Sequence, residues 1–195
     1  MHGMVNRALQ GFVTTTYGAD AWASVRSQAM LPVEDFEAML DYPDALTMQC
    51  FQAACGVLQK HPNVLLEDLG TWLVTHDDLE PLRRLLRFSG PTFLDFLYSL
   101  EEVGDRGRLA MPDLDMPSIV VEPQDGSGFR IRATWVLPGI GPILLGCLRA
   151  MADDYGALAF LTLDGIEGQE ECLLVQLLDT KHSAGRRFDL GQAQT

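Results

Sequence analysis

The sequence lacks any long apolar run. No stretch approaches the roughly 18 consecutive apolar residues of a membrane-spanning helix. Residues 1–7 mix apolar with polar residues, and no small-residue cleavage site follows, so there is no signal-peptide pattern. These absences predict a cytoplasmic protein. Its four cysteines, Cys50, Cys55, Cys147 and Cys172, are therefore expected to be reduced thiols, most of them buried as small apolar residues.

Positive charge is also scarce. The chain has 14 Lys and Arg residues against 27 Asp and Glu residues, which gives a formal net charge of -13. An acidic surface repels nucleic-acid phosphates and anionic lipid headgroups. We therefore expect neither nucleic-acid binding nor docking on a membrane.

The familiar catalytic motifs are missing too. The sequence has no phosphate-binding loop, no nucleophile elbow and no metalloprotease motif. Adjacent acidic residues occur at 101–102, 153–154 and 170–171. Because neighbours in sequence point apart on a helix or strand, we expect these pairs to lie on the surface rather than to work as acid–base pairs. The sequence therefore predicts that the protein is not an enzyme.

What is present is an ordinary globular composition, with 47% hydrophobic and 21% charged residues in 195. The first half has the apolar spacing of helices. The second half contains shorter apolar and β-branched segments separated by turn residues. Helices are expected over 4–17, 21–29, 32–40, 45–59, 64–76, 79–87, 92–103 and 142–155, and strands over 118–122, 129–137, 157–163 and 172–178, with a hairpin at 164–170.

This order predicts an α+β fold. We expect one domain over residues 1–182. It has an N-terminal helical lobe at about 1–62 and a C-terminal lobe at about 63–182, which contains a small antiparallel sheet and packed helices. The polar, glycine-containing residues 183–195 are expected to form a flexible tail.

The clearest strand pattern lies at residues 129–137. Apolar residues occupy its odd positions, and Arg130, Arg132 and Thr134 occupy its even positions. Such alternation is typical of a strand with one buried face. The two arginines are therefore expected to face solvent.

Five segments carry a more specific pattern: MHGMVNRAL at 1–9 with Tyr17-Gly18, LLEDLGTWL at 65–73, FLD at 93–95 leading to LEEV at 100–103, PDLDMPS at 112–118, and GIGPILLG at 139–146. In this order and spacing they resemble the H-NOX (haem–nitric-oxide/oxygen-binding) family from residue 1 to around residue 180.

The resemblance implies an H-NOX-like fold with haem held between the two lobes. In that family a histidine ligates the iron and a Tyr-x-Ser-x-Arg motif on a strand clamps the propionates. Nitric oxide breaks the iron–histidine bond and shifts one lobe against the other. The shift is read by a signalling protein, usually a histidine kinase or a cyclic-di-GMP enzyme in bacteria.

This sequence departs from the family at those positions. The ligand histidine should follow Val103, where the chain has Gly104. The clamp positions are Ala133, Trp135 and Leu137, which cannot neutralise propionates as an arginine does. A glycine alone could be an engineered cavity, but the joint loss indicates a natural lineage that stopped using haem. No haem and no other cofactor is therefore predicted.

Two pocket-lining positions of the family remain, Val5 and Pro117, so the walls of the pocket are expected to survive. The predicted ligand pocket comprises Val5, Gly104, Pro117, Ala133, Trp135 and Leu137. Gly104 is either an emptied ligand site or a helix stop. Trp135 either fills the volume left by haem or stacks on another ligand.

Other side chains allow either a structural or a functional interpretation. Arg106 and Arg108 either meet an anionic ligand or are solvated surface charges. Cys147 and Cys172 would need two further nitrogen or sulfur ligands to hold zinc, and only His182 is close in sequence, so no metal site is predicted.

Three functional hypotheses follow. The first is a sensory or regulatory module that works without haem, binds an apolar small molecule such as a fatty acid or no ligand, and signals to a partner protein. The second is a nitric oxide sensor that holds haem through a ligand foreign to the family. The third is a structural interaction module whose pocket is filled.

Overall fold

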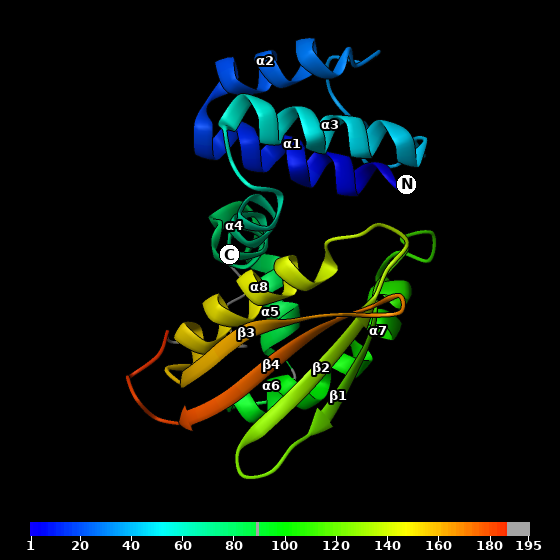
Figure 1. Ribbon diagram of the computed structural model, residues 1–195. Coiled ribbons are helices and arrows are strands. Elements are labelled where there is room, and N and C mark those ends of the chain that lie inside the picture. Colours follow the sequence, from blue (N-terminus) through cyan, green and yellow to red (C-terminus); the bar gives the residue numbers. More distant parts are fainter. Residues whose placement is uncertain (89, 187–195) are drawn as a thin grey trace.

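Helices make up the first half of the chain, and a four-stranded sheet with one long helix makes up the second (Figure 1). The structure, a computed structural model, describes residues 1–88 and 90–186. The helices are α1 (Gly3–Tyr17), α2 (Ala19–Ala29), α3 (Asp44–Leu58), α4 (Pro62–Thr75), α5 (Glu80–Arg87), α6 (Phe93–Ser99), α7 (Val103–Ala110) and α8 (Ile140–Tyr155), with short 3₁₀ turns η1 (Asp77–Leu79) and η2 (Leu100–Glu102). The strands are β1 (Ser118–Pro123), β2 (Gly128–Thr134), β3 (Leu158–Glu167) and β4 (Glu170–Asp179). The predicted α+β class is confirmed.

The helix expected over 32–40 is wrong. This segment is irregular, because its backbone N–H groups find partners outside it. The N–H of Phe36 donates to Oε1 of Gln10 at 3.1 Å, and the N–H of Glu37 donates to the Tyr42 hydroxyl at 2.9 Å. The Phe36 ring is buried in the first cluster, so this irregular segment packs against the first helices.

The helix expected over 92–103 is observed as three consecutive helical segments that together extend further along the chain. It consists of α6, η2 and α7, and α7 continues to Ala110. Gly104 therefore lies inside a helix, and the interpretation of Gly104 as a helix stop is wrong.

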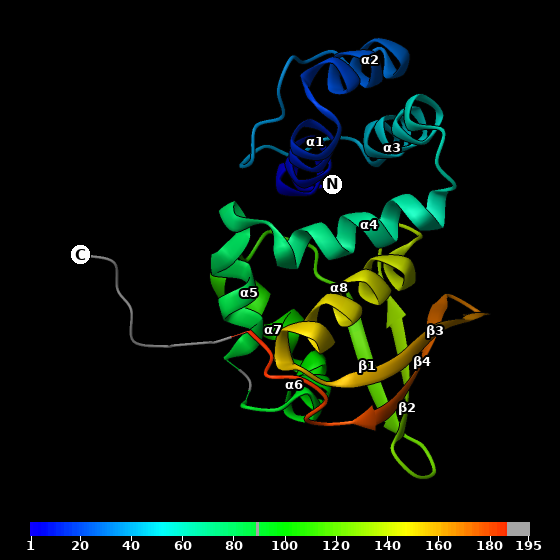
Figure 2. The ribbon, with the colours of Figure 1, turned by 90° about the vertical axis from the view of Figure 1, so that its left-hand side faces the viewer.

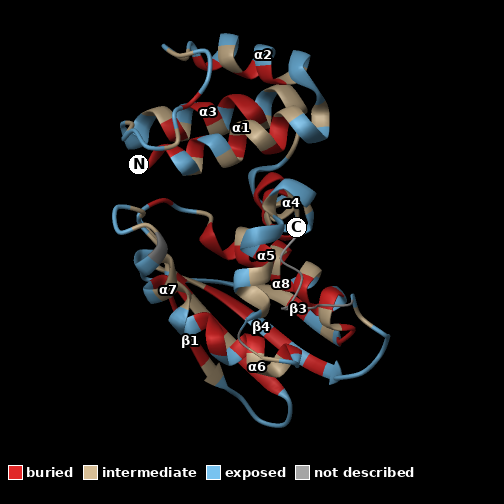
Figure 3. Cartoon of the chain, turned by 180° about the vertical axis from the view of Figure 1, so that it is seen from behind, coloured by how far each residue is buried: buried red, intermediate tan, exposed pale blue. Residues whose placement is uncertain are grey.

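Buried side chains form two clusters. One is built from α1, α2, α3 and α4, and the other from α6, α8 and the inner face of the sheet. Helices α1, α2 and α3 lie on one side of α4, and α8 and the sheet lie on the other (Figure 2); Figure 3 colours the same elements by burial. Helix α4 serves both, because Leu65 and Leu69 pack in the first cluster and Val74 in the second. The lobe boundary expected near residue 62 stays a prediction; the shared helix α4 begins at Pro62.

The sheet is antiparallel throughout, in the order β1-β2-β4-β3. Phe129 and Ile131 point to the buried face opposite Val175 and Leu173. Helices α6 and α8 cover that inner face. No helix among the described residues covers the outer face (Figures 1 and 2). None of the described helices is both long and apolar enough to cross a membrane.

One acidic pair expected on the surface is partly buried. Asp154, near the end of α8, receives hydrogen bonds from Arg83 at 2.8 Å and Arg87 at 3.0 Å, both from α5. The Arg87 guanidinium also lies 3.8 Å from the centre of the Tyr155 ring. The expectation was wrong for Asp154, because two arginines from a separate helix converge on its carboxylate.

The chain after β4 returns to the same end of α8. The N–H of Ser183 donates to the Gly156 carbonyl at 3.0 Å, and the N–H of Arg186 donates to the Asp154 carbonyl at 2.8 Å. The rest of the predicted tail, residues 187–195, lies outside the described residues.

Candidate functional site

The glycine at the expected ligand position is enclosed by protein. Gly104 is buried in the first turn of α7. A Cβ atom placed on it would lie 3.2 Å from the Pro117 carbonyl oxygen and 3.6 Å from the Arg108 guanidinium. A side chain here would therefore push against the backbone of the connector that leads into β1.

Trp135 also binds this connector. Its indole Nε1 donates to the Asp115 carbonyl oxygen at 2.9 Å, and its ring packs against the core of the second cluster. Ala133, two residues earlier at the end of β2, is fully buried in that core. The protein itself thus holds the indole, which supports the volume-filling interpretation.

Two contacts link predicted pocket residues to the connector at 115–117: Gly104 lies beside the Pro117 carbonyl, and Trp135 donates to Asp115. Ala133 lies in the core against which Trp135 packs. That these residues line one ligand pocket stays a prediction.

The place of the two other predicted residues, Val5 and Leu137, in a common pocket stays a prediction. Leu137 is buried in the link to α8. Val5 is half-buried on α1 in the other lobe, and neither Val5 nor Leu137 is among the described side chains that form the two clusters.

The arginines near these positions have protein partners. Arg106 donates to the Ser99 carbonyl at 2.9 Å, and Arg108 forms an ion pair with Asp105 at 2.5 Å.

Arg130 and Arg132 lie on the outer face of the sheet, as their parity predicts. They are more than solvated charges, because each is held by two carboxylates: Arg130 by Asp164 and Glu167, and Arg132 by Glu122 and Glu170.

Sequence reasoning missed Glu171. This side chain of β4 accepts hydrogen bonds from the backbone N–H groups of Gly139 at 2.6 Å, Ile140 at 3.2 Å and Gly141 at 2.9 Å. It therefore caps the start of α8 immediately after the clamp positions, where the first helical N–H groups have no partner within the helix. The sequence carries no local sign of this role. It depends on the pairing of Glu171 with Ala133 across the sheet, which becomes visible only once the strand register is known.

Replacing Glu171 with alanine is expected to lower the free energy of unfolding by about 1.5–3 kcal/mol, because three backbone donors lose a charged acceptor. Urea denaturation measures the change. Glu170→Ala is the matched control on the neighbouring residue, since its half-buried surface pair with Arg132 should contribute less than about 1 kcal/mol. Equal losses in the two variants would contradict the capping role.

The sequence matches a known protein family over most of its length. The model of the haem-NO-binding (HNOB) family matches residues 2–158. The chain belongs to this family, the H-NOX family.

Two curated relatives are guanylate cyclases. Soluble guanylate cyclase 89Da of Drosophila melanogaster is 23% identical over 158 residues, which is 81% of this chain and 24% of that protein. Soluble guanylate cyclase gcy-31 of Caenorhabditis elegans is 21% identical over 132 residues, which is 68% of this chain and 19% of that protein. The chain thus spans about a quarter or less of the length of these relatives.

Solved H-NOX proteins share the fold. A mutant H-NOX protein from S. oneidensis in the Fe(II) ligation state superposes with a TM-score of 0.78 at 12% identity, covering 93% of this chain and 98% of that one. The Fe(II) unliganded H-NOX protein from K. algicida gives 0.74 at 16% identity, covering 92% and 98%. The predicted H-NOX-like fold is confirmed, and this chain is a sensor domain of that type.

The residues of this H-NOX domain do not fit the family's haem. Gly104 supplies no nitrogen donor, and the direction in which a histidine would leave it meets the Pro117 carbonyl. The clamp positions supply a methyl group, an indole already bonded to Asp115, and a leucine. The cation and hydroxyls that a propionate requires are absent from these three positions.

Three histidines have another role. His2, His61 and His76 stand just before α1, α4 and η1, and Nδ1 of each accepts a backbone N–H two residues later at 3.3 Å. They act as helix N-caps, which ties each of them to a helix start away from α7.

No group of three or more His, Cys, Asp or Glu side chains within residues 1–88 and 90–186 has the arrangement of a metal site. Cys147 instead donates its thiol to the Gly70 carbonyl at 3.2 Å between α8 and α4. Desolvation there raises the pKa of Cys147 from 9.0 to about 12, and burial raises the pKa of Cys50 to about 12 as well. Both thiols therefore stay protonated at neutral pH.

These raised pKa values predict alkaline destabilisation. The folded state prefers the neutral thiols, so their stabilisation is complete below pH 9 and is lost as the pH rises from 9 to about 12. The free energy of unfolding should fall by up to about 1.4 kcal/mol per pH unit for each thiol. Denaturation at several pH values should show a shallower alkaline slope for Cys147→Ala. An unchanged slope would show that Cys147 ionises equally in both states.

Proposed function

We propose that this chain is an H-NOX-family regulatory domain that works without haem, is not itself an enzyme, and passes its signal to a partner protein. The observation that carries the proposal is the enclosure of Gly104 by the Pro117 carbonyl and Arg108. A haem sensor needs a nitrogen ligand at this place. Gly104 carries none, and a side chain placed on it would press against the Pro117 carbonyl oxygen.

The bonds around the connector support a packed site. Trp135 is tied to Asp115, and Glu171 holds the start of α8, so the segments that the family devotes to haem bind one another instead. This favours the version of the proposal without a ligand. Should a molecule enter between the six predicted positions, their uncharged side chains select an apolar one, such as a fatty acid.

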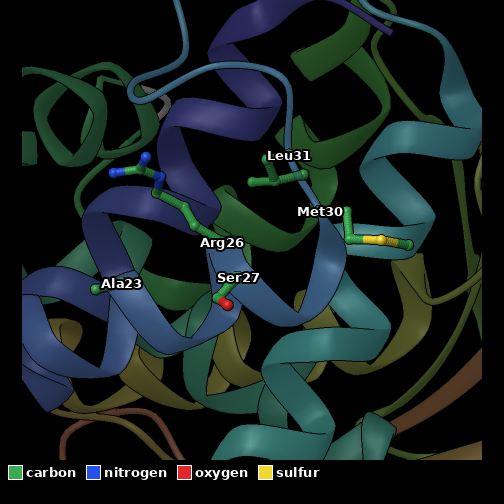
Figure 4. A pocket seen from close by; sticks show the side chains of 5 residues that line it. All are labelled: Ala23, Arg26, Ser27, Met30 and Leu31. Carbon is green, nitrogen blue, oxygen red and sulfur yellow. The ribbon is translucent and has the colours of Figure 1, made fainter.

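One depression on the described surface lies away from these positions. It is open, has a volume of about 320 Å³, and is formed by Ala23, Arg26, Ser27, Met30 and Leu31 on and after α2 (Figure 4). Helix α2 belongs to the first cluster, at the opposite end of the molecule from the sheet (Figure 1). It therefore offers no substitute for the family's haem pocket.

The family suggests the kind of output. H-NOX domains work with signalling proteins, and the relatives matched here are guanylate cyclases. The partner in this proposal is a signalling protein such as a histidine kinase or a cyclic-di-GMP enzyme.

The test is the haem content of the chain expressed in cells supplied with a haem precursor. We expect a haem-to-chain ratio far below one, whereas the K. algicida H-NOX protein prepared in parallel should retain haem. Native mass spectrometry of the same sample distinguishes the two versions: no added mass supports the packed site, and a bound fatty acid supports the apolar pocket. A stoichiometric haem mass would contradict the proposal.

A further inference from the structure

Three apolar side chains meet on the outer face of the sheet. Phe160 of β3 is 64% exposed, and Leu174 and Leu178 of β4 are 37% and 61% exposed. Phe160 pairs with Gln176, so the two leucines lie diagonally on either side of the phenyl ring, within reach of it. We call these three residues the β3–β4 patch.

The patch is open to a partner. Helices α6 and α8 pack on the opposite face of the sheet, and no described helix lies over this one (Figure 2). The free edge of β3 is less available, because Nη2 of Arg149 donates to the Leu161 carbonyl at 3.1 Å. The side-chain face, rather than the strand edge, is therefore the accessible feature.

An ion-pair network with excess negative charge begins beside the patch, because Arg130 of β2 lies opposite Leu174. In this network four carboxylates, those of Glu122, Asp164, Glu167 and Glu170, pair with two guanidinium groups, those of Arg130 and Arg132. The whole chain carries -13. Two copies of this face would repel each other, whereas a cationic surface would be attracted.

We propose that the β3–β4 patch is the docking surface for the signalling partner, and that the partner presents apolar side chains surrounded by lysine or arginine. Phe160 is the central anchor, because aromatic side chains at the centre of a contact contribute most to binding. The inference rests on the proposed function in one respect, that the output is a partner protein, and it does not depend on haem.

A synthetic amphipathic peptide of leucine and lysine serves as the probe. Amide chemical shifts of the isotope-labelled full chain are followed during titration, at low and at high salt, and a leucine–glutamate peptide is titrated in parallel. We expect shifts centred on the patch with the cationic peptide only, and binding that weakens as salt increases.

Phe160→Ser and Leu178→Ser should each weaken binding at least about tenfold. Met39→Ser is the matched control, since Met39 is 77% exposed on the first lobe. All three positions are exposed, so the variants should fold.

Equal binding by all three variants, or shifts centred elsewhere, would overturn the proposal. A dimer in sedimentation that Phe160→Ser dissociates would assign the patch to a second copy of the chain and would also overturn it. The two proposals fail separately: a haem-loaded chain that binds the peptide at the patch refutes only the haem-independent function, and a haem-free chain that does not bind refutes only the docking surface.

Discussion

Replacing Asp154 with alanine is expected to lower the free energy of unfolding by about 3–5 kcal/mol. The side chains of Asp154, Arg83 and Arg87 are only 8–10% exposed, and the carboxylate lies 2.8 Å and 3.0 Å from the two guanidinium groups. Its removal leaves two positive charges poorly hydrated and facing each other. The loss should appear as a shift of the urea denaturation midpoint.

A surface ion pair provides the control. Asp105 pairs with Arg108 at 2.5 Å, but the two side chains are 78% and 56% exposed. Asp105→Ala should therefore change stability by less than about 1 kcal/mol. Similar losses for Asp154→Ala and Asp105→Ala would show that the buried cluster does not hold α5 against α8.

Gly146→Ala is the second substitution with a large expected effect. Helices α4 and α8 approach so closely that a Cβ on Gly146 would lie 2.0 Å from the Glu67 carbonyl oxygen and 2.8 Å from the Thr71 nitrogen. Both are backbone atoms and cannot rotate away, so the helices must separate. We expect a loss of about 3 kcal/mol, at the upper end for overpacking.

Gly56→Ala is the matched control for this change, because Gly56 also lies inside a helix. A Cβ there would meet only the mobile amide end of Gln28, at 2.8 Å. Alanine should be neutral or stabilising by up to about 1 kcal/mol, since it raises helix propensity. Calorimetry of the two variants compares them directly, and equal stability would contradict the close packing of α4 and α8.

Local patterns were enough to predict most elements of the fold. The alternation at 129–137 placed Phe129, Ile131 and Ala133 on the buried face of β2, because one apolar face is sufficient to fix the side on which a strand packs. The helical spacing at 142–155 anticipated α8 in the same way.

Features that depend on distant residues were not predicted. The segment at 32–40 does not form the expected helix, because its backbone N–H groups bond to Gln10 and Tyr42, which precede and follow it in the sequence. Asp154 and Glu171 were assigned to the surface because their partners are about 70 and 30 residues away in sequence. Pairing across such distances depends on tertiary packing, which periodicity does not encode.

The candidate site likewise has features that the sequence predicts and features that depend on tertiary packing. The absence of a ligand at Gly104 and of a clamp at Ala133, Trp135 and Leu137 could be read from the sequence once the family resemblance fixed the register. The contact of Gly104 with Pro117 could not, because it depends on how the connector folds over α7. Val5, predicted for the same pocket, lies half-buried on α1, and its part in a pocket between the lobes stays a prediction.

The absorption spectrum of the purified chain, titrated with ferrous haem and then exposed to nitric oxide, tests haem independence most directly. We expect a broad band of unligated haem that does not saturate at one equivalent and is the same with Gly104→Ala. A sharp Soret band that saturates at one haem per chain and moves when nitric oxide is added would contradict haem independence.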